Sequence, residues 1–203
     1  MSMNNIKKYK VGRRLGAGVY DKCQTQKFAL SEARHEKNKR GGRRKNVSNY
    51  GKQLLEKQKV RFMYGVSEKQ FSNYVKKAMA TKEGNPQDAL FQLLENRIDN
   101  VVYRLGLAGS RRHARQMVSH GHFIINGTKT TIPSYNVSNS DIIEVRKQSQ
   151  EKPLFTNTEE TKRTVAVNWL SFDNKNMKAE ITGVPTEPDS FLDFTQVLEY
   201  YTR

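Results

Sequence analysis

Apolar residues recur every three to four positions through the middle of the chain, and this spacing predicts helices. The clearest repeat joins Phe71, Val75 and Ala78. It follows Ser67, which stands three residues before Gln70 as in a capping box. By the same criteria, helices are predicted over 52–64, 67–83, 86–105, 111–118 and 191–201.

Short strand-like runs replace the helical spacing after residue 121. The Asn126-Gly127 pair between 123–125 and 128–132 is the strongest short hairpin signal, because both residues tolerate a positive φ. Further strands are expected over 141–146 and, around Trp169, over 165–172. The polar segment 148–162 between them predicts no regular element.

These elements predict an α+β chain with a mainly helical domain and an inserted small α/β module of two helices and a β-hairpin. We expect the helical domain, with its terminal strand and helix, to consist of 51–93 and 148–203, and the module to cover 94–147. Residues 1–50 are expected to form a flexible basic arm.

Charge is distributed very unevenly along the chain. The formal net charge is +16, and residues 1–62 hold eighteen Lys and Arg against four Asp and Glu. Residues 148–203 hold six bases against nine acids. A basic segment with almost no apolar residues indicates a polyanionic partner, because phosphate neutralisation releases counterions. A membrane partner is disfavoured, since it needs an amphipathic helix with an apolar face, which the stretch around Gly41 and Gly42 lacks.

Composition excludes several other classes. Cys23 is the one cysteine, so neither an internal disulfide nor a multi-cysteine zinc site is possible, and His35 cannot complete a tetrahedral site with it. No apolar run reaches the length of a membrane span or a signal core, so we expect a soluble, cytoplasmic chain. Gly16-Ala17-Gly18 follows no predicted strand, so no nucleotide cofactor or small-molecule substrate is expected.

The predicted helix over 111–118 carries three arginines in its first five residues. Arg111, Arg112 and Arg115 stand near the helix N-terminus, where each exposed cation costs about 0.3 to 1 kcal/mol against the helix dipole. Arg111 and Arg115 lie one turn apart and share a face. This local cost suggests that an anion binds there.

Several stretches resemble bacterial-type small-subunit ribosomal protein number four, nearly collinearly over 48–146. They are LEKQKVR at 55–61, YGV at 64–66, EKQF at 68–71, LENRIDNVVYRLG at 94–106, ARQMVSHG at 114–121 and NG at 126–127. Membership in this family implies a structural protein that binds the 5′ domain of small-subunit ribosomal RNA at a multi-helix junction and nucleates subunit assembly. It also implies that the chain itself is not an enzyme.

The resemblance implies that the inserted module is an RNA-binding module with a concave RNA-binding face. The corresponding residues here are Arg104, Ser110, Arg111, Arg112, Arg115, Gln116, Ser119 and His120. The charge of the arm and of the helix that follows it adds candidate RNA contacts at Arg13, Arg14, Lys39, Arg40, Arg43, Arg44, Lys45, Lys52, Lys57, Lys59 and Arg61.

The resemblance also implies two further partners. In the family the arm approaches the entrance channel of messenger RNA, so Arg43, Arg44 and Lys45 become candidates for gripping that strand. The family's carboxy-terminal end contacts small-subunit protein number five, an interface tied to decoding accuracy.

Two other interpretations compete. The same module occurs in pseudouridine synthases, and Arg97-Ile98-Asp99 resembles their catalytic motif. Asp99, however, lies inside an apolar-periodic helix, and no second domain of the required size remains. A free RNA chaperone or stress factor would need only the arm and 94–147, which leaves the helix over 67–83 without a purpose.

Overall fold

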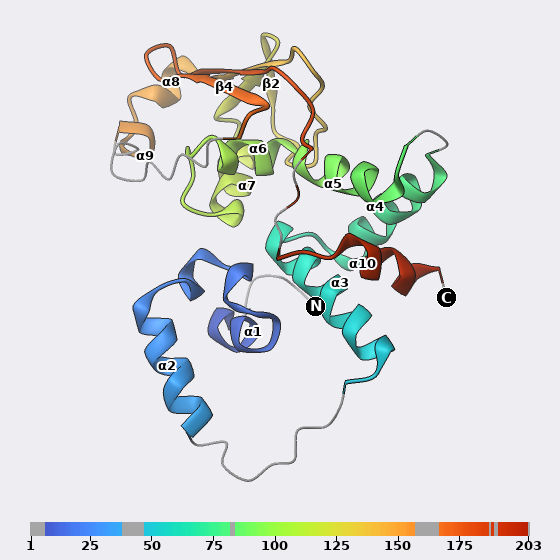
Figure 1. Cartoon of the computed structure of the whole chain (residues 1–203). Helices are drawn as coiled ribbons and strands as arrows, with labels where there is room; N and C mark the ends of the chain where they lie inside the picture. The colour runs from blue at the N-terminus through green and yellow to red at the C-terminus, as the bar shows by residue number, and fades with distance from the viewer. Residues whose placement is uncertain are drawn as a thin grey trace. The chain divides into compact units, whose positions relative to one another are not determined.

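The computed structural model describes residues 7–37, 47–81, 84–156, 167–186, 188 and 191–202, and the chain divides into two compact units (Figure 1). We call Met1–Lys82 with Asp189–Arg203 the helical unit, and Glu83–Pro188 the sheet unit. The sheet unit is thus larger than the expected module, because it continues past residue 147 to residue 188. None of the described helices is long and apolar enough to cross a bilayer.

The described part of the helical unit consists of helices and 3₁₀ turns. They are α1 (Lys8–Leu15), η2 (Ala17–Val19), η3 (Asp21–Cys23), α2 (Gln26–Lys37), α3 (Asn49–Tyr64), α4 (Glu68–Ala80) and α10 (Phe194–Tyr201). The helix predicted from the Phe71 repeat is confirmed as α4, whose first turn is capped by Ser67: Oγ accepts the Gln70 N–H at 3.3 Å.

Residues 7–37 are folded, which corrects the expectation of a flexible arm over 1–50. The side chains buried in this segment are Leu15, Val19, Cys23 and Phe28. Each lies on a different short helix or turn, so no single amphipathic helix displays them. The expected arm residues Lys39, Arg40, Arg43, Arg44 and Lys45 lie outside the described residues.

Helix α3 begins three residues earlier than predicted. The Oγ atom of Ser48 caps it by accepting the Gly51 N–H at 3.2 Å, so Gly51 lies in the first turn rather than at the boundary. At the other end, Gly65 adopts a left-handed φ of 63°, which closes the helix. The residues that α3 buries are Gln53, Lys57, Val60 and Tyr64, a stripe that is half polar.

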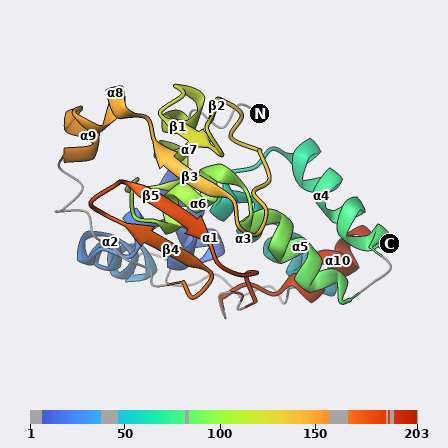
Figure 2. The same cartoon turned by 90° about the horizontal axis from the view of Figure 1, so that it is seen from above.

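The sheet unit combines short helices with one antiparallel sheet. Its elements are α5 (Pro86–Glu95), α6 (Ile98–Arg104), α7 (Arg111–Ser119), β1 (Phe123–Ile125), β2 (Thr128–Thr130), β3 (Ile142–Val145), α8 (Lys147–Gln150), α9 (Pro153–Thr156), β4 (Leu170–Asp173) and β5 (Lys178–Ile181). The strand order is β2-β1-β3-β5-β4 (Figure 2). The predicted hairpin is confirmed, with φ of 48° at Asn126 and 80° at Gly127.

The helix predicted over 86–105 is broken into α5 and α6 at Asn96 and Arg97. Arg97 is extended and forms an isolated bridge with Asn136. The loop around Asn136 also supplies the carbonyl of Tyr135, which accepts the first free N–H of α6, from Ile98, at 2.9 Å. A distant loop therefore stabilises the break, while the apolar spacing runs straight through it.

The end of the sheet also differs from the prediction. The strand expected around Trp169 is β4, and it pairs with β5, a strand that the sequence pattern did not reveal. Since β5 also pairs with β3, this terminal strand pair belongs to the sheet unit and not to the helical domain. Within the segment expected to be irregular, α8 and α9 are short helices.

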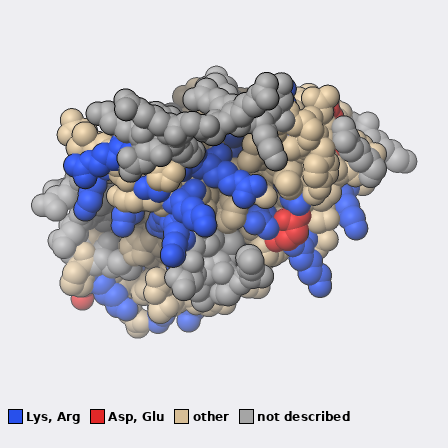
Figure 3. Space-filling view, turned by 90° about the horizontal axis from the view of Figure 1, so that it is seen from below, with Lys and Arg blue, Asp and Glu red and all other residues tan. Residues whose placement is uncertain are grey.

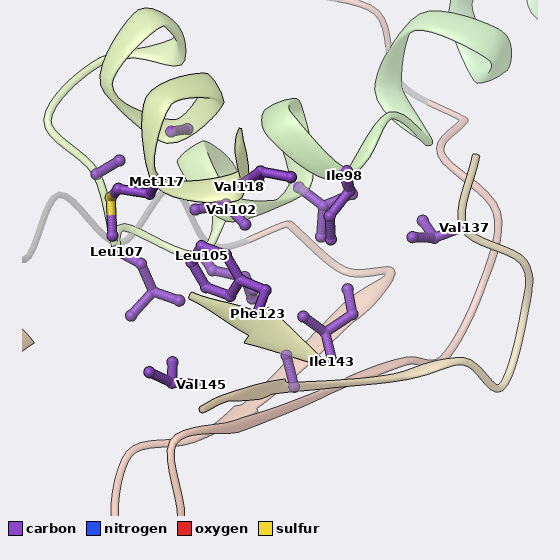
Figure 4. Close-up of a cluster of buried hydrophobic side chains, with 14 of the residues drawn as sticks. Ile98, Val102, Leu105, Leu107, Met117, Val118, Phe123, Val137, Ile143 and Val145 are labelled. Carbon is purple, nitrogen blue, oxygen red and sulfur yellow. The ribbon is translucent and has the colours of Figure 1, made fainter. Parts of the chain in front are cut away.

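One apolar core joins the helices to the sheet. Val102 from α6 and Met117 and Val118 from α7 lie toward Phe123 and Ile143 from the strands (Figure 4). All five side chains are at most 2% exposed. This packing fixes α6 and α7 against the sheet and so determines which face of α7 meets solvent.

Candidate nucleic-acid interface

Helix α7 has one buried face and one polar face. Ser110 caps it as expected, with Oγ accepting the His113 N–H at 3.3 Å. Ala114, Met117 and Val118 are buried in the core. The exposed side chains, on the rest of the helix and at its end, are Arg112, Gln116, Ser119 and His120. The structure therefore brings these four predicted site residues together on the surface.

Two arginines meet at one buried carboxylate beneath this face. Arg97 donates to Asp99 through Nε at 3.0 Å and through Nη2 at 2.8 Å. Arg115 of α7 donates from Nε to Asp99 Oδ2 at 2.8 Å and pairs with the same oxygen through Nη2 at 2.7 Å. The Asp99 side chain is only 3% exposed. Such pairing fixes the guanidinium plane of Arg115 on α7.

A second buried carboxylate organises the neighbouring side chains. Glu95 accepts from Arg104 Nε at 2.9 Å and from Arg104 Nη2 at 2.8 Å. Glu95 also accepts from Asn100 Nδ2 at 2.9 Å. The Oδ1 atom of Asn100 then accepts from Arg111 Nε at 2.7 Å. The Cζ atom of the Arg111 guanidinium lies over the Tyr103 ring, 4.5 Å from its centre.

One predicted contact residue, Arg104, is buried. Its guanidinium is paired with Glu95, so it links α5 and α6, and its role in RNA binding stays a prediction. Arg111 and Arg115 are half-buried and oriented by polar partners. Glu95 is a functional candidate that sequence reasoning missed, and Asp99 was considered there only as part of the Arg97-Ile98-Asp99 motif. The available signal was that both acids lie within the apolar-periodic segment 86–105.

The predicted contacts Lys57 and Arg61 of the helical unit are bound within the chain. Lys57 pairs with Glu68 of α4, and its ammonium lies 4.5 Å from the centre of the Tyr200 ring. Arg61 Nη1 donates to the same Glu68 at 2.9 Å. Tyr201 of α10 donates its hydroxyl to Glu68 at 2.9 Å. These two bases therefore fasten α3 to α4 and α10.

Burial and charge act in opposite directions on Glu68. Burial by itself raises the pKa of this carboxyl. The hydrogen bonds from Lys57 and Tyr201 and the charges of Lys57 and Arg61 lower the pKa by more than burial raises it, so the pKa lies below the usual value. Burial likewise raises the pKa of Tyr201, and the bond to Glu68 adds to that effect. At neutral pH the Glu68 carboxylate is therefore charged, and its ion pairs with Lys57 and Arg61 join α4 to α3.

The remaining predicted bases of the helical unit differ in their surroundings. Lys59 pairs with Glu56 at 2.5 Å and lies 4.9 Å from the centre of the Phe191 ring. Arg13 is exposed and donates from Nη2 to Ser31 Oγ at 2.8 Å. Arg14 and Lys52 are exposed. On the face drawn in Figure 3, Lys and Arg side chains are much more widespread than Asp and Glu side chains.

The described residues contain no group of three or more His, Cys, Asp or Glu side chains that could hold a metal ion. Cys23 is buried, and this burial raises the pKa of its thiol.

Two family models match the chain. The model described as Ribosomal protein S4/S9 N-terminal domain matches residues 4–95, and the S4 domain model matches 96–143. The small ribosomal subunit protein uS4 of Clostridioides difficile (strain 630) is 44% identical over 90% of this chain and 89% of its own length. The protein of the same name from Clostridium tetani is 42% identical over 94% of both chains. In Thermotoga maritima the uS4 protein is 39% identical over 96% of both chains.

The chain belongs to the uS4 family.

Membership in the uS4 family confirms the family resemblance and the α+β fold class. It also decides against the enzyme interpretation, because the curated uS4 relatives are named as ribosomal proteins. The geometry agrees, since the Asp99 carboxylate of the suspected catalytic motif is buried and bound by two arginines. A catalytic carboxylate has to reach its substrate.

Proposed function

We propose that this chain is a structural protein of the cytoplasmic small ribosomal subunit and binds the 5′ domain of its ribosomal RNA at a multi-helix junction, nucleating assembly. The names of its uS4 relatives support the subunit assignment. The observation that carries the proposal is the polar face of α7, where Arg112 and Gln116 are exposed beside Arg111 and Arg115.

The mechanism is preorganised recognition of the RNA backbone. RNA duplexes are recognised mostly by shape and by contacts to phosphates and 2′-hydroxyls. An arginine guanidinium can grip a phosphate with two hydrogen bonds. Asp99 and Asn100 hold Arg115 and Arg111 in place before the RNA arrives. Less side-chain entropy is then lost on binding.

The basic amino-terminal third supplies a second, nonspecific contribution to affinity. Its excess of bases over acids accounts for most of the net charge of +16. We further propose, from the family resemblance alone, that Arg43, Arg44 and Lys45 lie near the entrance channel of messenger RNA. On the same basis, the carboxy-terminal end contacts small-subunit protein number five and so affects decoding accuracy.

Filter binding of the full chain to a transcript of the 5′ domain tests the main proposal. If six to ten phosphates are neutralised, affinity should fall by about 10³ to 10⁵ between roughly 50 and 200 mM salt. The double variant Arg112→Ala with Gln116→Ala should bind about tenfold more weakly or worse, because one charge-assisted hydrogen bond contributes roughly 1.5 to 3 kcal/mol.

Lys175→Ala is the matched control, because Lys175 is an exposed base on the turn between β4 and β5. It should leave junction binding close to that of the wild type. Equal binding by the control and the double variant, or affinity that does not change with salt, would contradict the proposal. Cosedimentation with small subunits at high salt separates a resident protein from a free RNA chaperone, which would be released.

A further inference from the structure

The loop between β2 and β3 leaves two large apolar side chains in solvent. Ile132 is 60% exposed and Tyr135 is 40% exposed, whereas Val137 is only 1% exposed and belongs to the core (Figure 4). Among the residues that the structure describes, the Tyr135 side chain has no stacked ring, cation or hydrogen-bond partner. The Tyr103 ring, by contrast, lies beneath the guanidinium of Arg111. Packing within the described chain therefore does not account for an aromatic side chain at position 135.

Backbone hydrogen bonds fix this loop. The Tyr135 N–H donates to the carbonyl of Ile132 at 3.1 Å, which closes a turn. The Tyr135 carbonyl accepts the Ile98 N–H at 2.9 Å, and the Val137 N–H donates to the carbonyl of Asn96 at 2.8 Å. The backbone that carries the exposed ring is thus bonded to the junction of α5 and α6 before any partner arrives. Such preorganisation reduces the entropy lost on binding.

The same loop borders the second half of α7. Its Pro133 carbonyl accepts the Asp99 N–H at 3.3 Å, and the Asp99 side chain holds Arg115 of α7 at 2.7 Å. Where the loop begins, Thr131 lies beside Gly121, the residue at which the chain leaves α7: a Cβ added to Gly121 would lie 3.3 Å from Thr131 Cγ2. Two separate contacts therefore place the loop next to the candidate nucleic-acid interface.

A lysine adds positive charge to this border. Lys129 of β2 is exposed, and its side chain lies across Gly121, where an added Cβ would overlap the Lys129 Cε atom. Within the described ranges, Lys129 forms no ion pair with an acid. Ile132 and Tyr135 are therefore accompanied by two bases, Lys129 before the loop and Arg115 beside it.

An aromatic ring beside cations is the arrangement with which proteins bind unpaired nucleotides. The bases of single-stranded RNA stack on tyrosine rings, while lysine and arginine neutralise the phosphates on either side. The centre of a protein–protein interface is instead depleted of charged residues. The positive charge around Ile132 and Tyr135 therefore favours RNA as the occupant of this surface.

We propose that residues 131–135 form a base-stacking platform, on which the Tyr135 ring stacks against an unpaired RNA base, Ile132 packs against the same nucleotide and Lys129 contacts a neighbouring phosphate. The inference rests on the proposed function, since the base belongs to the junction that α7 contacts. A continuous duplex offers no unpaired base. The platform thus adds a means of distinguishing a junction from a duplex to the backbone contacts of α7.

Filter binding of the full chain to the 5′-domain transcript tests the stacking of Tyr135. Tyr135→Ala should bind at least about fivefold more weakly, the loss expected when one base loses its aromatic partner. Tyr135→Phe keeps the ring and should bind like the wild type. The slope of affinity against salt should not change in Tyr135→Ala, because no phosphate contact is removed, but it should decrease in Lys129→Ala.

Val184→Ala is the matched control, because Val184 is another exposed apolar residue of the sheet unit, beyond β5, and is 49% exposed. It should bind the transcript as tightly as the wild type. Urea unfolding of each free variant checks the fold. Tyr135→Ala should unfold at the same urea concentration as the wild type, since the exposed ring has no partner in the described part of the chain.

Fluorescence gives a direct signal of stacking. The chain has one tryptophan, Trp169, which is only 7% exposed. In Tyr135→Trp, the emission from position 135 should be quenched when the transcript is added, because a stacked base quenches indole fluorescence. The wild-type chain, with Trp169 alone, gives the background.

Tight transcript binding by the wild type and by Tyr135→Ala alike, with no quenching in Tyr135→Trp, would overturn this inference and leave the proposed function intact. Unchanged transcript binding by Tyr135→Ala together with poorer incorporation into small subunits would assign the loop to a protein partner, and would also overturn it. Absence of transcript binding by the wild type would overturn both.

Discussion

Asp99 is the residue on which the organisation of α7 depends most, so Asp99→Asn is the most informative substitution. The carboxylate accepts four contacts of 2.7 to 3.0 Å from Arg97 and Arg115. Asparagine has the same size but no charge. Its amide N–H groups would face the guanidinium N–H groups of Arg97 and Arg115, which are also donors. The variant removes the Asp99 charge from beside Arg97, which is only 2% exposed.

The burial of Asp99 and Arg97 sets the size of the expected stability loss. Removing one partner of a buried ion pair costs about 3 to 5 kcal/mol, because an uncompensated charge remains in the interior. With a urea slope of about 2 to 3 kcal/mol per M, the unfolding midpoint should fall by about 1 to 2.5 M. Urea unfolding of the free protein, followed by circular dichroism, measures this shift.

Arg115→Gln separates stability from binding. The Arg115 side chain is 30% exposed, and Asp99 keeps its two bonds to Arg97 in this variant. We expect a stability loss of only about 1 to 2 kcal/mol, typical of a substitution away from the core. RNA binding should nevertheless weaken in the filter assay.

For Asp99→Asn, a shift of the urea midpoint below about 0.3 M would refute this argument, since the Asp99 carboxylate would then contribute little to stability.

Three other predictions concern the helical unit and acid pH. Gly16→Ala should lower the stability by about 1 to 3 kcal/mol in thermal unfolding, because φ is +102° and the added Cβ would lie 2.8 Å from the Phe191 ring. Gly84→Ala, at φ +85° with open space around it, should cost less; equal losses would contradict the packing argument. Glu68→Gln should remove a contribution that is present above the usual carboxyl pKa and lost as the pH falls through the lowered one, so the two curves should converge in acid. Since the folded pKa of His122 lies below 6.5, stability should fall as the pH drops below 6.5 in wild type and less so in His122→Asn.

The helices with local start signals could be predicted from the sequence. Ser67 before α4 and Ser110 before α7 are caps in the structure, and the Asn126-Gly127 turn has the expected positive φ values. These signals act over a few residues, so a local pattern is sufficient. The break at Asn96 was not predictable in this way, because a loop some forty residues later supplies its hydrogen bonds.

The candidate nucleic-acid interface likewise contains residues that local sequence signals reveal and residues that depend on contacts with other helices. The arginines of α7 stand out in the sequence because cations near a helix N-terminus are unfavourable. In the structure Arg112 is exposed, whereas Arg111 and Arg115 are half-buried beside Asn100 and Asp99. Burial of Arg104 and Lys57 could not be predicted from residue type, since both are normally surface residues. Each is paired with an acid on a neighbouring helix, Glu95 for Arg104 and Glu68 for Lys57, and the sequence does not show that these helices pack together.

Directed cleavage of the RNA tests the central claim most directly. Cys23 is 2% exposed, so an iron chelate can be attached selectively at Gln116→Cys on α7, with Lys175→Cys as the control. Hydroxyl radicals generated at Gln116→Cys should cut the 5′ domain of small-subunit RNA at a cluster of nucleotides around one junction. Cleavage no stronger than that from the control position would contradict the account.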